Sequence, residues 1–140
     1  MMNGRLLLTL LVMLPILAQA KIPDAQIAST VQKYFSMSHS APPLVLAEIT
    51  NDFIHGRTLI IKIIGNRNSK QEDLAFAFAV GAAVANLAAN PIEMLWVEVD
   101  IHFKDLETGV AIAPVACCVD AMVLGACDFE TWWKDCLQFL

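Results

Sequence analysis

The spacing of apolar residues changes along the chain from helical to alternating and back, and these changes predict the order of its elements. Residues 22–35 contain a proline and an aspartate near their start and then place Ile27, Val31 and Tyr34 or Phe35 at helical spacing. This pattern predicts a helix with one apolar face. Residues 36–43 contain two prolines and are expected to form a loop.

Residues 44–65 predict a β-hairpin with a three-residue loop, Ile54–Gly56, in which Gly56 takes the left-handed conformation. The register that follows pairs apolar with apolar residues and acid with base: Ile49 with Ile61, Ala47 with Ile63, and Glu48 with Lys62.

Residues 68–91 predict a second helix, with Ser69 and Glu72 as a capping box and Asn90-Pro91 as its end. No polar residue occurs from Leu74 to Ala85, so the helix must be buried on every side. One sheet covers one side only, which leaves the first helix, a second copy of the chain, or a membrane or client protein to cover the other. The candidate interface residues of this helix are Phe76, Val80, Gly81, Val84 and Leu87.

Residues 92–124 predict a second hairpin with Glu107–Gly109 as its loop. In that register Val97 lies opposite Val119 and Val99 opposite Cys117. Residues 128–140 predict a short helix that Asp128 caps. The expected fold is therefore a two-layer α+β sandwich, in which a four-stranded antiparallel sheet of two hairpins is combined with helices in the order α-ββ-α-ββ-α.

The first twenty residues have the features of a signal peptide. Arg5 precedes the apolar stretch Leu6–Leu17, and Ala18-Gln19-Ala20 matches a cleavage site. The stretch is shorter than the roughly twenty residues that span a bilayer, so contact with a membrane is not expected to persist. Cleavage leaves residues 21–140 as a single domain, soluble and exported to a periplasm or secreted.

The cysteines, all in the C-terminal part, are Cys117, Cys118, Cys127 and Cys136. An exported chain meets an oxidising compartment, where an even number of cysteines predicts disulfides, and their spacing does not match a metal site. If Cys117 and Cys118 are neighbours on a strand, they point to opposite faces, which leaves two pairings with Cys127 and Cys136. We favour Cys118 with Cys136, because the last helix would then cover the outer face of the last strand.

Net charge argues against nucleic-acid binding. Without Arg5 the chain carries eight basic and fourteen acidic residues, a net charge of −6, and has no basic stripe. Nine of the acidic residues lie in residues 91–140, which favours either a basic partner or simple solubility.

One strand face gathers polar residues at alternate positions: Trp96, Glu98, Asp100 and His102, with Lys104 at its end. Such a face is either a small-ligand or metal site or the solvent side of an amphipathic strand. No G-x-S-x-G, H-E-x-x-H or glycine-rich phosphate motif is present, so we predict no catalytic residue and no cofactor. The sequence favours a small exported, non-catalytic binding or assembly module that acts through a protein partner, with a homodimer as one form of that assembly. The alternative is a small-ligand-binding, metal-binding or hydrolytic protein that uses the polar face of the third strand.

Overall fold

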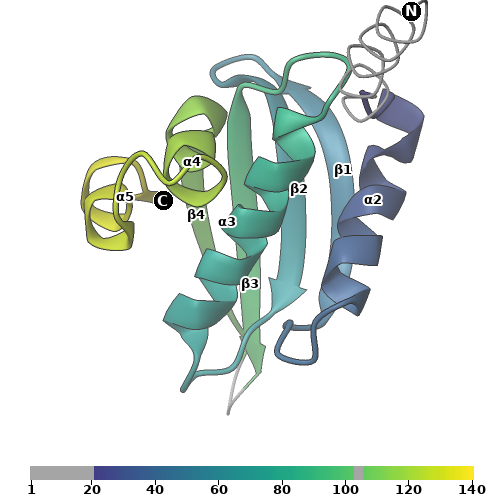
Figure 1. The fold of residues 1–140 in the computed structure, drawn as a ribbon. Helices are drawn as coiled ribbons and strands as arrows, with labels where there is room; N and C mark the ends of the chain where they lie inside the picture. Colours follow the sequence, from purple (N-terminus) through teal and green to yellow (C-terminus); the bar gives the residue numbers. More distant parts are fainter. Residues whose placement is uncertain (1–20, 103–105) are drawn as a thin grey trace, which may run out of the picture.

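The structure is a computed structural model that describes residues 21–102 and 106–140. The predicted signal peptide, Phe103 and Lys104 lie outside these residues. The described chain is an α+β fold with four helices and a five-stranded sheet (Figure 1). The elements are α2 (Asp24–Ser36), β1 (Leu44–Asp52), β2 (Gly56–Ile64), α3 (Lys70–Asn86), β3 (Met94–His102), β4 (Leu106–Pro114), α4 (Val115–Met122), α5 (Phe129–Asp135) and β5 (Gln138–Phe139).

The sheet is mixed rather than antiparallel, which corrects the predicted fold. Its strand order is β1-β2-β3-β4-β5, and the central pair β2 and β3 is parallel while the other neighbouring pairs are antiparallel. The reason is the length of α3, whose 17 residues span about 25 Å at 1.5 Å per residue. A nine-residue strand covers about 30 Å. The helix therefore returns the chain to the end of the sheet where β2 began, and β3 must run in the same direction.

The first hairpin has the predicted faces but a different register. Ile49 lies opposite Leu59 and Ala47 opposite Ile61, a shift of two residues that keeps the apolar side chains on one side. Glu48 lies opposite Ile60, so the predicted pair of Glu48 with Lys62 does not form. Gly56 has a φ of 76°, as the turn prediction required.

The second hairpin differs more. Glu107 to Gly109 belong to β4 and not to the loop, and Val97 lies opposite Ala111. The strand ends at Pro114, and the residues that were expected to continue it form α4. An uninterrupted apolar run does not by itself distinguish a buried strand from a buried helix, and the proline, which cannot donate to a strand ladder but suits a helix start, marks the boundary.

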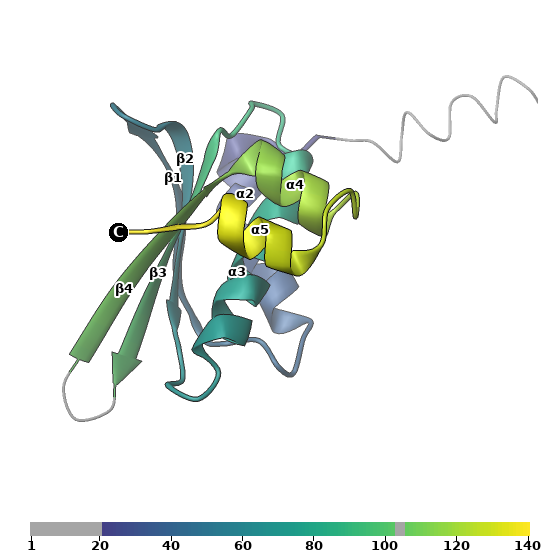
Figure 2. The same ribbon diagram turned by 90° about the vertical axis from the view of Figure 1, so that its left-hand side faces the viewer.

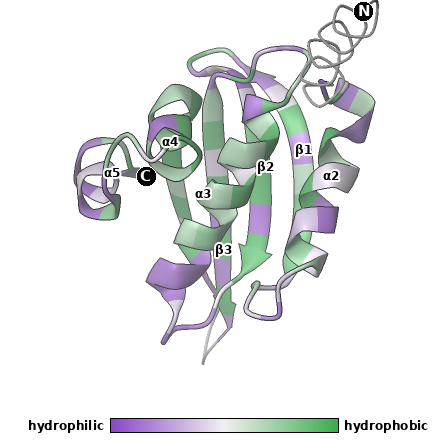
Figure 3. Ribbon diagram, in the orientation of Figure 1, coloured by the Kyte–Doolittle hydropathy of each residue, from purple (hydrophilic) through white to green (hydrophobic). Residues whose placement is uncertain are grey.

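All the described helices lie on one side of the sheet, as Figure 2 shows. α3 packs between α2 and α4 and against β2 and β3, while its outward side is left uncovered (Figure 3). The helix is therefore not buried on every side as predicted, and residues such as Ala75 and Ala79 are partly exposed. Val80, Gly81 and Val84 are buried, and a Cβ on Gly81 would lie 3.1 Å from Leu95 Cδ1. Of the five candidate interface residues, Phe76 and Leu87 are partly exposed. The Phe76 ring packs edge-on against the ring of Phe35 in α2, with ring centroids 5.1 Å apart.

The N-terminus of α3 has a different cap from the predicted one. Ser69 Oγ does not accept a helix N–H as the capping box requires. It donates a hydrogen bond to Asp73 Oδ2 instead, and the same carboxylate oxygen accepts the backbone N–H of Asn66, both at 3.0 Å. Asp73 is buried, and its carboxylate accepts hydrogen bonds from polar groups of the loop between β2 and α3.

α5 lies on the helix side of the sheet and does not cover the open face, and the chain end then adds β5 to the edge of the sheet beside β4. The predicted Cys118–Cys136 pairing is wrong, because Cys136 is bonded to Cys117 of α4. On a helix, neighbouring cysteines need not point to opposite faces, so the strand argument fails with the strand itself. Asp128 caps α5 as predicted, its Oδ1 accepting the N–H of Thr131 at 2.7 Å. Within residues 21–102 and 106–140, no helix is long and apolar enough to cross a membrane.

Candidate functional site

The face of the sheet opposite the helices carries a row of side chains that crosses all its strands. Residues paired across neighbouring strands share a face. The row runs from β1 to β5 through Glu48, Ile60, Trp96, Ile112 and Gln138. Trp96 therefore occupies the centre of the uncovered face, on the parallel strand pair.

A second row lies beside it and contains charged residues. It runs through Leu46, Lys62, Glu98 and Val110, and Leu140 reaches its end through a backbone hydrogen bond to the Val110 carbonyl. Lys62 Nζ lies 3.4 Å from Asp100 Oδ2, and the Asp100 Oδ1 atom accepts a hydrogen bond from Thr108. Asp100 is thus held by its neighbours on both sides.

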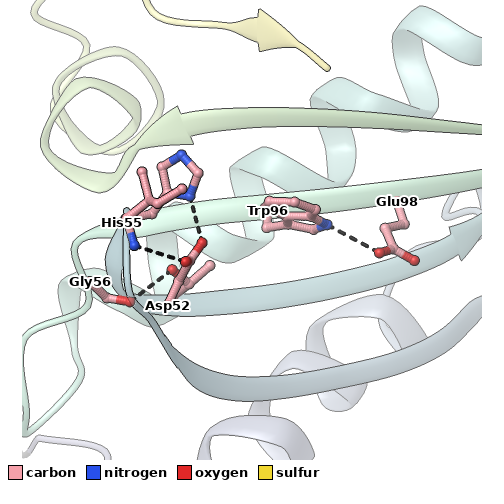
Figure 4. Close-up of polar contacts among 7 residues, drawn as sticks. Asp52, His55, Gly56, Trp96 and Glu98 are labelled. Atoms are coloured by element: carbon pink, nitrogen blue, oxygen red, sulfur yellow. Dashed lines mark hydrogen bonds and ion pairs between the residues drawn. The ribbon is translucent and has the colours of Figure 1, made fainter.

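The tip of the first hairpin is fixed beside this face (Figure 4). His55 Nδ1 lies 2.6 Å from Asp52 Oδ2, and the Ile54 backbone N–H donates to Asp52 Oδ1 at 3.0 Å. These hydrogen bonds, from Ile54 first and then from His55, hold the pKa of Asp52 below its ordinary value. The His55 ring meets the Trp96 ring edge-on with centroids 6.2 Å apart, so the hairpin tip packs directly against the centre of the open face.

Two carboxylates on the face have no cationic partner among the described residues. Trp96 Nε1 donates to Glu98 Oε1 at 3.2 Å and orients this carboxylate (Figure 4). Lys62 lies opposite Glu98 across the strands, but its ion pair is with Asp100. Glu48 is exposed at the β1 end of the central row. An aromatic ring with neighbouring carboxylates attracts a cation both through the ring face and through charge.

Large apolar side chains surround the charged centre. Leu46, Ile64, Leu106 and Leu140 alternate onto this same face and are 41%, 38%, 58% and 61% exposed. The hairpin tip adds Phe53 and Ile54, which are 104% and 81% exposed. Turn tips usually carry glycine, asparagine or other small polar residues, so two exposed apolar residues at this tip are unusual.

The predicted site residues share the face, as alternation along β3 required. Trp96, Glu98 and Asp100 are partly buried near its centre, whereas His102 is exposed at the end of β3 opposite Leu106. No group of three potential metal-ligating side chains was found in residues 21–102 and 106–140. The structure adds Asp52 and His55, which the sequence analysis did not select. In the sequence this pair could be found from the aspartate three residues before a histidine that directly precedes the turn glycine, a pattern that allows an Asx turn.

Two other places in the fold bring together groups of the kind that catalytic or phosphate sites use. Ser38 and Ser40 contact each other at 3.1 Å, and His39 between them is exposed. The parallel pair β2 and β3 places the N-terminus of α3 at the carboxyl ends of both strands, where many α/β proteins bind phosphate. Here the Asp73 carboxylate bonds to the loop at this end of the helix and places a negative charge where an anion would bind.

No protein-family model, curated protein or solved structure matches this chain significantly.

Proposed function

We propose that this chain is an exported, non-catalytic binding module that engages a protein partner through the open face of its sheet. The observation that carries the proposal is the combination on one uncovered face of a central tryptophan, unpaired carboxylates and a border of exposed apolar side chains. Protein-binding surfaces are enriched in aromatic anchors within a partly polar surround. The Cys117–Cys136 disulfide supports export, since such bonds persist in oxidising compartments.

The charges indicate the chemistry of the partner. Glu48 and Glu98 form no ion pair within the described residues, and the chain without its first twenty residues has a net charge of −6. A partner segment with lysine or arginine next to apolar residues fits this face, with a cation near Trp96 and Glu98 and apolar side chains over Leu46 and Leu140.

A small-molecule site is less suited to this geometry. Ligand pockets are concave and enclose most of the ligand, whereas no described helix covers this face of the sheet (Figure 2), on which the strand pairing places Trp96. The open face is better matched to an extended protein surface.

Site-specific photocrosslinking in the exported fraction tests the proposal. A photoreactive residue at Val110, inside the face, is compared with one at Gln32, an exposed position on α2. We expect one discrete protein adduct at position 110 that is absent at position 32, weakens severalfold in high salt and weakens again with Glu98→Gln. Equal adducts at both positions, or an adduct at 110 that is insensitive to salt and to Glu98→Gln, would contradict the proposal.

A further inference from the structure

Two cysteines are left as thiols by the Cys117–Cys136 bond, namely Cys118 and Cys127. Cys118 follows Cys117 on α4 and is completely buried. Cys127 is partly buried and directly precedes Asp128, the cap of α5. Both cysteines pack in or against the same apolar core.

The chain between the two thiols folds back on α4. The backbone N–H of Ala126 donates to the carbonyl of Asp120 at 2.6 Å, and Gly125 has a φ of 64° that makes the turn possible. Cys127 stands just before the cap of α5 and Trp132 four residues after that cap, two positions that often pack together at a helix start. The Trp132 Nε1–H in turn points at Cys118 Sγ, 3.3 Å away.

We propose that Cys118 and Cys127 form a second disulfide in the exported protein. The two bridges then join adjacent residues of α4 to the two ends of α5, because Cys127 precedes this helix and Cys136 follows it. A helix of seven residues is not stable alone, so its position depends on such ties and on the burial of Trp132. The inference depends on export to an oxidising compartment but not on the binding function proposed above.

The oxidation proceeds by two thiol–disulfide exchanges with a disulfide-bearing oxidant such as oxidised glutathione or a dithiol–disulfide catalyst. The Cys127 thiolate attacks the oxidant and forms a mixed disulfide, which releases one oxidant thiol. Cys118 then gives up its proton and attacks Cys127 Sγ, which releases the second. Two protein thiols lose two electrons and two protons, and the oxidant disulfide becomes two thiols.

The surroundings of the two sulfurs assign the order of these steps. Burial raises the pKa of the Cys118 thiol to about 11; the Trp132 hydrogen bond opposes that rise and the nearby Cys127 adds to it. Cys118 is therefore a poor first nucleophile at neutral pH, and the more exposed Cys127 reacts first.

The test is peptide mapping of the exported protein after denaturation and alkylation without reductant. We expect no alkylated cysteine and a Cys118–Cys127 cross-link alongside Cys117–Cys136. Alkylation of both Cys118 and Cys127, or a Cys118–Cys136 cross-link, overturns the inference. Two matched variants, each with only one cysteine of the 118–127 pair left as a free thiol, test the order of reaction. Each variant is mixed with oxidised glutathione. Cys118→Ala is expected to form a mixed disulfide at Cys127 at least tenfold faster than folded Cys127→Ser forms one at Cys118, and equal rates would refute that order.

Discussion

Trp132 is predicted to anchor the C-terminal segment, whereas its neighbour Trp133 is not. Trp132 is 0% exposed and its ring meets Phe78 of α3 at 5.3 Å, while Trp133 is partly exposed and packs on Phe129 and Phe139. A buried tryptophan removes about 150–250 Å² from water, which at about 25 cal/mol per Å² amounts to about 4–6 kcal/mol. Measured losses for tryptophan-to-alanine changes in cores are about 3–5 kcal/mol.

We therefore expect Trp132→Ala to lower the free energy of unfolding by about 4 kcal/mol. For a domain of about 120 residues this corresponds to a fall in Tm of about 15 °C. Trp133→Ala is the matched control and should lower Tm by less than half as much. Thermal unfolding followed by circular dichroism measures both.

A second substitution keeps this test informative if Trp132→Ala does not fold. Trp132→Phe retains a ring against Phe78 but loses the donor to Cys118, and we expect a loss of about 1–2 kcal/mol. Equal losses for the substitutions at 132 and 133, or a larger loss at 133, would show that the assignment of the anchor is mistaken.

Three further predictions concern the links that hold the elements. In a Cys127→Ser background, replacing Cys117 and Cys136 by alanine removes a bridge between residues 19 apart. It should destabilise the fold by about 3 kcal/mol and lower Tm by about 12 °C, whereas an unchanged midpoint by calorimetry would contradict a stabilising role. The hydrogen bond from the Thr131 N–H lowers the pKa of Asp128 in the folded state. The stabilisation that this cap gives the fold is therefore complete above the pKa of Asp128 in the unfolded chain, and it is lost as the pH falls through the lower pKa of the folded state. Asp128→Ala should accordingly lower Tm at pH 7 and much less near pH 2. If the Tm difference between the original protein and this variant does not shrink at low pH, the capping role of Asp128 is refuted. Gly56→Ala should lower the free energy of unfolding by about 1–2 kcal/mol, because an alanine is strained at a φ of 76°, and a neutral effect in urea unfolding would exclude that strain.

Local patterns predicted the elements better than their connections. The helical spacing of Ile27, Val31 and Phe35 predicted α2 with its buried face, and alternation along β3 separated Val97 and Val99 from Trp96 and Glu98. These features depend on neighbours within one element. The direction of β3 depends instead on how far α3 carries the chain, which apolar spacing does not encode but the length of the helix does.

The errors in the second hairpin have one physical origin. The apolar run after Pro114 fits both a buried strand and a buried helix. Reading it as a strand moved the loop to Glu107–Gly109 and placed Cys117 and Cys118 on opposite faces of the sheet, whereas both lie on α4. The same reading placed the last helix over the outer face of β4. In the structure Trp132 packs α5 against α3 on the helix side of the sheet, so no helix covers the opposite face around Trp96.

The missed pair Asp52 and His55 connects the two parts of the candidate surface. Phe53 and Ile54 project from a hairpin tip that would otherwise be free to move, and ordering such a loop on binding has an entropic cost. Asp52 fixes the tip from within through Ile54 and His55, and the His55 ring rests against Trp96. The apolar tip and the aromatic centre of the face are therefore held together in one fixed arrangement. A surface organised in this way needs little rearrangement to bind, which supports the protein-binding role proposed above.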